Sequence, residues 1–152
     1  MERIRTALRI LCIAGTICAL FCCGAASYLL SNIPLVQDTS LTAAGIAFNA
    51  DSAYALVGTI LFAAALYLFA TCLFGIRCAR LVRRMNMLRA LSLGGFALFV
   101  VCILACLVIG EIHRMGWMTV IGAILSYSIA SFAGEISRAL IASHMLRGND
   151  DA

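Results

Sequence analysis

The sequence contains no lysine and little charge of any kind. Charged residues make up 12% of its 152 residues, whereas 64% are hydrophobic and the net charge is +4. Soluble domains are about 25% charged and about 45–50% apolar, and a folded chain of this size leaves about a third of its surface exposed to water. The composition therefore excludes a soluble enzyme, a nucleic-acid-binding domain and a disordered regulator, and it predicts an integral membrane protein.

Residue types that carry chemistry inside membranes are also missing. The long apolar stretches contain no Asp, Glu, Arg, His, Asn or Gln, although coupled ion or proton transport needs ionisable groups within the bilayer. No phosphate-binding loop, nucleophile elbow or zinc-protease motif is present. His113 and His144 are expected on opposite sides of the membrane. The sequence predicts no catalytic residue, no cofactor and no metal site.

Four apolar stretches are each long enough to cross a bilayer as a helix. About 20 residues span the hydrocarbon core, and a helix satisfies its own backbone hydrogen bonds there. We expect an all-α fold, a single membrane domain of residues 1–152 built as a four-helix bundle. The predicted spans are residues 10–30, 53–76, 90–110 and 115–134, with the last helix continuing to about residue 147.

The arginines predict the orientation of these spans. All of them except Arg114 precede the first span, connect the second to the third, or follow the fourth. The positive-inside rule then places both termini in the cytoplasm. Residues 31–52 would lie outside, with Asp38 or Ser40 capping a short interfacial helix. Alternatively the first span is a signal peptide, cleaved near residues 24–26; the orientation of the other spans would be the same.

The connector between the second and third spans is strongly basic. Its arginines are Arg77, Arg80, Arg83, Arg84 and Arg89. Arg77, Arg80 and Arg84 would share one face if the second helix continued into the cytoplasm. Such a stretch forms a specific site for anionic lipid headgroups or an acidic partner, or it orients the chain and anchors it in the headgroup region.

Small residues recur every four positions along the predicted spans, which allows helices to approach closely in lipid. These positions are Ala14, Cys18, Cys22 and Ala26, then Cys102, Cys106 and Gly110, then Gly122, Ser126, Ala130 and Gly134. A second row of Gly15, Ala19 and Cys23 lies beside the first. The rows predict either packing within one bundle or an interface with a second copy or a membrane partner. A turn as short as residues 111–114 makes the third and fourth helices antiparallel neighbours.

Two alternative functions depend on the remaining polar groups. A small oligomeric channel or transporter would be lined by the fourth-span hydroxyls of Ser126, Tyr127, Ser128 and Ser131. A thiol-redox membrane protein would use Cys72, Cys78 or Cys22. Most of the eight cysteines lie in apolar runs, where a thiol packs as a small residue.

The second half of the chain resembles a family of small bacterial four-span membrane proteins, domain of unknown function 2975. The resemblance covers residues 73–146 and rests on the basic connector, Arg89-Ala90-Leu91, Glu111-Ile112, a Thr119-Val120-Ile121-Gly122 stretch and Arg138-Ala139-Leu140. It implies a bacterial inner-membrane protein without assigned catalytic residues. We expect a non-enzymatic accessory or regulatory protein that acts through helix packing and a basic cytoplasmic face.

Overall fold

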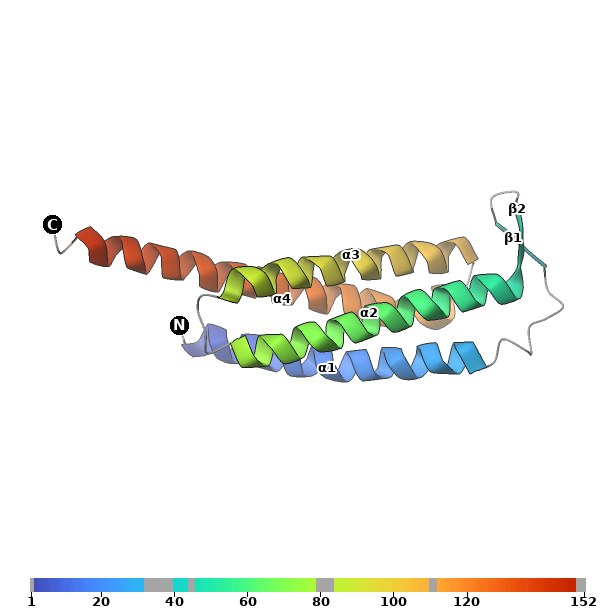
Figure 1. Ribbon diagram of the computed structural model, residues 1–152, viewed down its shortest axis with the longest axis horizontal. Helices are drawn as coiled ribbons and strands as arrows, with labels where there is room; N and C mark the ends of the chain where they lie inside the picture. The colour runs from blue at the N-terminus through green and yellow to red at the C-terminus, as the bar shows by residue number, and fades with distance from the viewer. Residues whose placement is uncertain (1, 32–39, 44–45, 79–83, 110–111, 150–152) are drawn as a thin grey trace.

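The computed structural model describes residues 2–31, 40–43, 46–78, 84–109 and 112–149. Within these ranges the fold is all-helical apart from one small hairpin (Figure 1). The helices are α1 (Glu2–Ser31), α2 (Ala50–Cys78), α3 (Met85–Ile109) and α4 (Ile112–Asn149), and the strands are β1 (Ser40–Ala43) and β2 (Ile46–Asn49). The helices overlap the predicted spans and extend beyond most of their ends.

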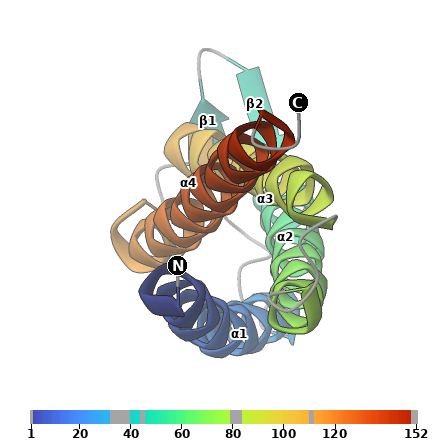
Figure 2. The same cartoon turned by 90° about the vertical axis from the view of Figure 1, so that its left-hand side faces the viewer.

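The four helices run alternately up and down and form a ring (Figure 2). Each helix packs on the next along the chain, α1 closes the ring against α4, and α2 and α4 barely touch. Only residues 110–111 separate α3 from α4, and these two helices are antiparallel neighbours, which confirms the prediction. α4 is the longest helix and runs past the others at one end (Figure 1).

The outer surface of the bundle is apolar. All four helices are long and apolar enough to cross a membrane, over Ile4–Tyr28, Ala55–Arg77, Met85–Leu107 and Gly116–Ala139. Large side chains such as Ile13, Phe21, Leu66, Leu104 and Ile124 are exposed on this surface, where a soluble bundle carries polar residues. The helices therefore indicate a multi-pass membrane protein.

The buried side of each helix follows a 3.5-residue repeat. On α3 the buried positions alternate three and four residues apart: Met85, Leu88, Ser92, Gly95, Phe99, Cys102 and Cys106. On α1 they are Leu8, Cys12, Gly15, Ala19, Cys22 and Ala26. This spacing is typical of left-handed, knobs-into-holes packing.

The predicted four-residue row on α1 does not follow that repeat. Ala14 is exposed and Cys18 is half-buried, whereas Cys22 and Ala26 are buried. Successive residues four apart drift by about 40° around a helix of 3.6 residues per turn, so a row of this spacing leaves the buried face within a few steps. The prediction that Ala14 packs within the bundle is wrong, and Gly15 takes that place.

The segment before α2 forms a hairpin and not the predicted interfacial helix. β1 and β2 pair antiparallel, with Leu41 opposite Phe48 and Ala43 opposite Ile46. Polar and apolar residues alternate along β1, and along β2 the large apolar Ile46 and Phe48 alternate with Ala47 and Asn49. Alternation with a two-residue connection that contains Gly45 is a β-hairpin pattern. The helix prediction is wrong because it gave more weight to capping residues than to this period of two.

α2 is described as far as Cys78, and most of the basic connector follows it. Arg77 lies in the last turn of α2 and Arg84 immediately precedes α3. Arg77 and Arg84 therefore lie at the ends of two different helices and do not share the face that a continuous second helix would have given them. Arg80 and Arg83 lie outside the described residues, as does Gly110.

Candidate functional site

Arginines collect at one end of the bundle, where α1 begins, α2 ends and α3 begins (Figure 1). We call this the basic end. Its described arginines are Arg5, Arg9, Arg77, Arg84, Arg89 and Arg138. Arg5 is half-buried and the others are exposed. The helix order alone therefore brings together cations that are far apart in the sequence.

A pocket opens between α3 and α4 at the basic end, with a volume of about 240 Å³. We call it the α3–α4 pocket. α3 contributes Arg89 and Leu93, and α4 contributes Tyr127, Ala130, Ser131, Gly134, Glu135 and Arg138. The pocket therefore combines two guanidinium groups, a carboxylate and two hydroxyls with an apolar wall.

Small-residue packing positions Arg89 in this pocket. A Cβ atom placed on Gly134 would lie 3.4 Å from Arg89 Nε and 3.6 Å from Arg89 Cζ. The guanidinium of Arg89 therefore lies across α4 where that helix has no side chain. On the same pair of helices, Ser137 Oγ donates a hydrogen bond to Asn86 Oδ1 at 2.6 Å. This bond fixes the spacing of α3 and α4 beside the pocket.

Tyr127, at the other end of the pocket, pairs with an aromatic ring of α3. The rings of Phe96 and Tyr127 have centroids 5.7 Å apart and are tilted by 53°, a favourable geometry for aromatic side chains. Because Phe96 lies on α3 and Tyr127 on α4, the pair also joins the two helices.

The charged groups of the pocket are not neutralised by one another. In the part of the chain that the structure describes, no ion pair joins Glu135 to Arg138 or to Arg89. Glu135 and Arg138 are three residues apart on α4, a spacing that permits an ion pair, but these two described residues do not form one. The pocket has two guanidinium groups and one carboxylate, so its net charge is positive. The guanidinium N–H donors are available, which suits an anion.

The predicted small-residue positions lie mostly between helices. Gly122, Ser126, Ala130 and Gly134 of α4 are buried, as are Cys102 and Cys106 of α3. A Cβ atom on Gly122 would lie 2.5 Å from Cε1 of Phe99, so the Phe99 ring occupies the space that this glycine leaves. In the second row, Gly15 and Ala19 are buried and Cys23 is half-buried.

The hydroxyl residues proposed to line a channel do not lie in one common environment. Ser126 is buried, and its Oγ has no hydrogen-bond partner among the described residues. Ser131 and Tyr127 line the α3–α4 pocket instead, and Ser128 is half-buried. Several other hydroxyls donate to carbonyls of their own helix, for example Thr71 to Tyr67 at 2.8 Å and Thr16 to Cys12 at 2.9 Å, as helix hydroxyls commonly do.

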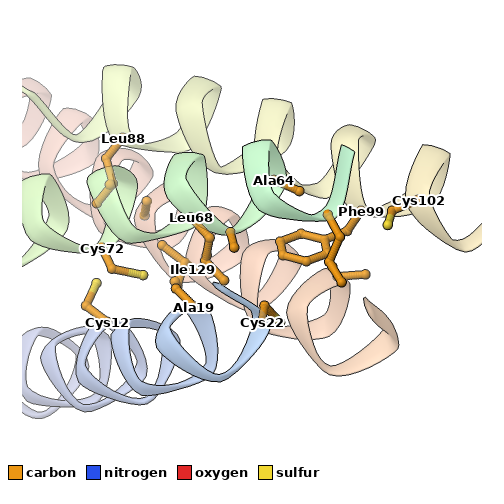
Figure 3. Packing of buried hydrophobic residues seen from close by; sticks show 14 of the residues in the cluster. Cys12, Ala19, Cys22, Ala64, Leu68, Cys72, Leu88, Phe99, Cys102 and Ile129 are labelled. Carbon is orange, nitrogen blue, oxygen red and sulfur yellow. The ribbon is translucent and has the colours of Figure 1, made fainter. Parts of the chain in front are cut away.

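Two cysteines from different helices meet in the core. The side chains of Cys12 on α1 and Cys72 on α2 point toward one another (Figure 3) and are in hydrogen-bonding contact. Both are free thiols and both are buried. Cys22 contacts Cys18 on its own helix, and the side chain of Cys78 lies outside the described part. Cys72, one of the three cysteines proposed for redox chemistry, therefore faces a thiol from another helix.

Among the described side chains, no three His, Cys, Asp or Glu lie close enough to hold a metal ion. Comparisons of the chain with family models, curated proteins and solved structures find no match. The resemblance to domain of unknown function 2975 stays a prediction.

Sequence reasoning missed the pocket and the second thiol. Arg138 was used for orientation and in the family resemblance, and Leu93 and Cys12 were not singled out. The sequence nevertheless contained an indication of the pocket. Two antiparallel helices joined by a short turn place residues that are equally distant from the turn at the same level along the helix axes. Counting back from residues 110–111 in this way places Arg89 opposite the part of α4 that holds Gly134 and Arg138.

Proposed function

We propose that this protein is a small multi-pass protein of the bacterial inner membrane with both termini in the cytoplasm. It acts without catalysis, as an accessory or regulatory protein whose basic end binds anionic lipid headgroups. Membership of the family of domain of unknown function 2975 is part of this proposal. The observation that carries it is the collection of arginines at one end of a bundle with an apolar outer surface.

The physical support is the charge asymmetry. Each Arg close to an anionic membrane surface contributes roughly 1 kcal/mol of attraction, and the same asymmetry favours a cytoplasmic location for the basic end. Helix packing supplies the rest of the proposal, because closely packed helices with buried small residues form a rigid scaffold that can dock on a membrane partner.

Neutralising the connector tests this proposal. We expect the variant with Arg77, Arg80, Arg83 and Arg84 all changed to Gln to lose part of its cytoplasmic orientation. Green fluorescent protein and alkaline phosphatase fused after Ala152 report the two sides, and the phosphatase signal should rise several-fold in the variant. Purified variant should also retain less anionic lipid.

Arg114→Gln is the matched control, because this arginine lies on the opposite side of the predicted topology. It should leave both signals unchanged. Equal behaviour of the connector variant and this control would show that the basic connector determines neither orientation nor lipid retention.

The contact between Cys12 and Cys72 favours a second candidate, a thiol-redox membrane protein. Forming a Cys12–Cys72 disulfide removes two protons and two electrons, and a lipid-soluble quinone would accept them and become a quinol. The chain would then deliver electrons from its thiols to the quinone pool.

Thiol counting distinguishes this candidate from the first. After incubation of the purified protein with a quinone, mass spectrometry should find a peptide linking Cys12 to Cys72 and two fewer thiols open to alkylation after denaturation. The Cys12→Ala variant should lose the link. Full alkylation of both cysteines in the treated wild-type protein would eliminate the redox candidate.

A further inference from the structure

The α3–α4 pocket changes from charged to apolar along the helix axes. Arg89 and Arg138 lie at the basic end. Leu93 lies about one turn farther along α3, and Tyr127 about three turns back from Arg138 along α4, both toward the middle of the bundle. A phospholipid has the same order of polarity when it lies beside a membrane helix, with its phosphate at the interface and its acyl chains in the hydrocarbon.

We infer that the α3–α4 pocket holds the phosphodiester headgroup of one membrane phospholipid, with the start of an acyl chain against Leu93 and Tyr127. This inference rests on the proposed function and makes it specific. In place of a diffuse attraction between the basic end and anionic headgroups, the inference gives a defined site for a single lipid.

The guanidinium groups identify phosphate as the chemistry that is recognised. An Arg presents several N–H donors in a planar fork that matches two phosphate oxygens. Arg89 approaches from α3 and Arg138 from α4, and neither is paired with Glu135 in the described part of the chain. The Ser131 hydroxyl offers a further donor on the same wall.

The size and charge of the pocket narrow the choice of ligand. Its volume of about 240 Å³ is below the range of about 300–1,000 Å³ that is typical of sites for drug-sized molecules, so it suits a headgroup. Glu135 repels the second negative charge of a phosphate monoester. It can accept a hydrogen bond from a headgroup hydroxyl or amine, which favours a phosphodiester such as phosphatidylglycerol.

The arrangement of α3 and α4 keeps the site formed before a lipid arrives. Gly134 leaves the space that Arg89 crosses, and the Ser137–Asn86 hydrogen bond holds the two helices beside it. A preformed site loses little conformational entropy on binding.

Native mass spectrometry of the full chain in a maltoside detergent, which has no phosphate, tests the inference. Titration with dioctanoylphosphatidylglycerol should give one bound lipid well before any others. The Arg89→Gln and Arg138→Gln variants should each weaken that binding about tenfold or more, since each removes charge-assisted hydrogen bonds to the phosphate. Unchanged elution on size-exclusion chromatography checks that both variants remain folded.

Arg77→Gln and Arg84→Gln are the matched controls. Both arginines are exposed at the basic end and neither lines the pocket, so these changes should alter the affinity less than twofold. If they weaken binding as much as the pocket variants do, attraction is diffuse, which overturns the pocket but leaves the proposed function standing.

Further arms of the titration distinguish the sources of phosphate. Deacylated glycerophosphoglycerol and inorganic phosphate should bind at least tenfold more weakly than the lipid, and equal binding would show a site for a soluble phosphate compound. Dioctanoylglycerol, which has no phosphate, should not bind. If it binds as well as the phospholipid, the chain has no preference for an anionic headgroup, and both the inference and the proposed function are wrong.

Discussion

Replacing Gly122 by alanine is expected to lower the free energy of unfolding by about 1–3 kcal/mol, the usual cost of overpacking a core. The added Cβ would lie 2.5 Å from Cε1, 2.6 Å from Cζ and 2.9 Å from Cδ1 of Phe99. Phe99 is completely buried, so its ring cannot move aside into lipid. Relief requires α3 and α4 to separate, and that loses contacts along the whole interface.

Pulse proteolysis across a series of SDS mole fractions measures this effect, because only the unfolded fraction is cleaved. Gly24→Ala is the matched control, since a Cβ at Gly24 meets nothing within 4 Å while the gain in helix propensity is the same. Adding Phe99→Leu to Gly122→Ala should restore part of the stability. Equal midpoints for the two single alanine variants would show that Phe99 does not require the space at Gly122.

Alanine at Gly15 or at Gly75 is expected to destabilise the α1–α2 pair by a similar 1–3 kcal/mol. A Cβ on Gly15 would lie 2.5 Å from Cys72 Sγ, and a Cβ on Gly75 would lie 2.6 Å from Cys12 Sγ. The same Cys-x-x-Gly spacing thus occurs on both antiparallel helices, and each thiol fits against the glycine of the other helix. Both sites are buried, so a methyl group fits only if the thiol leaves its position or the helices separate.

A paired exchange separates this steric effect from a general loss of helix packing. Gly15→Ala combined with Cys72→Ala adds one carbon and removes the sulfur that it would meet, so the double variant should recover to within about 1 kcal/mol of the wild-type protein. Gly15→Ala combined with Cys12→Ala removes the other thiol and should not recover. Identical SDS midpoints for the two double variants would contradict the reciprocal fit. The same proteolysis assay applies.

The helices and their order were predictable, whereas the faces that pack were predictable only in part. On α4 the small residues at Gly122 and Gly134 lie on the buried side as the four-residue row suggested. On α1 the same reasoning selected Ala14, which is exposed. The buried faces repeat every 3.5 residues, and two rows of small residues beside one another on α1 gave no local reason to prefer the one with Gly15.

The α3–α4 pocket was missed in the sequence because its two arginines belong to different helices. The sequence grouped Arg89 with the connector arginines, but Arg89 lies beside Arg138 and Gly134. Arginines that are close along the chain can belong to one basic stretch and still lie in different sites. The hairpin of β1 and β2 is the opposite case. Its alternating pattern lies within one short stretch of sequence, so it could have been predicted.

The sequence by itself determined the number of membrane-length helices, their approximate limits and the uneven distribution of arginine. These properties depend on transfer free energies and charges that add up along the chain, and they need no knowledge of neighbouring helices. Only the tertiary structure decided that Cys12 meets Cys72, that Phe99 fills the space at Gly122 and that a charged pocket opens between α3 and α4. Those contacts require complementary shapes on two helices at once. Such complementarity depends on both surfaces, so neither stretch of sequence specifies it alone.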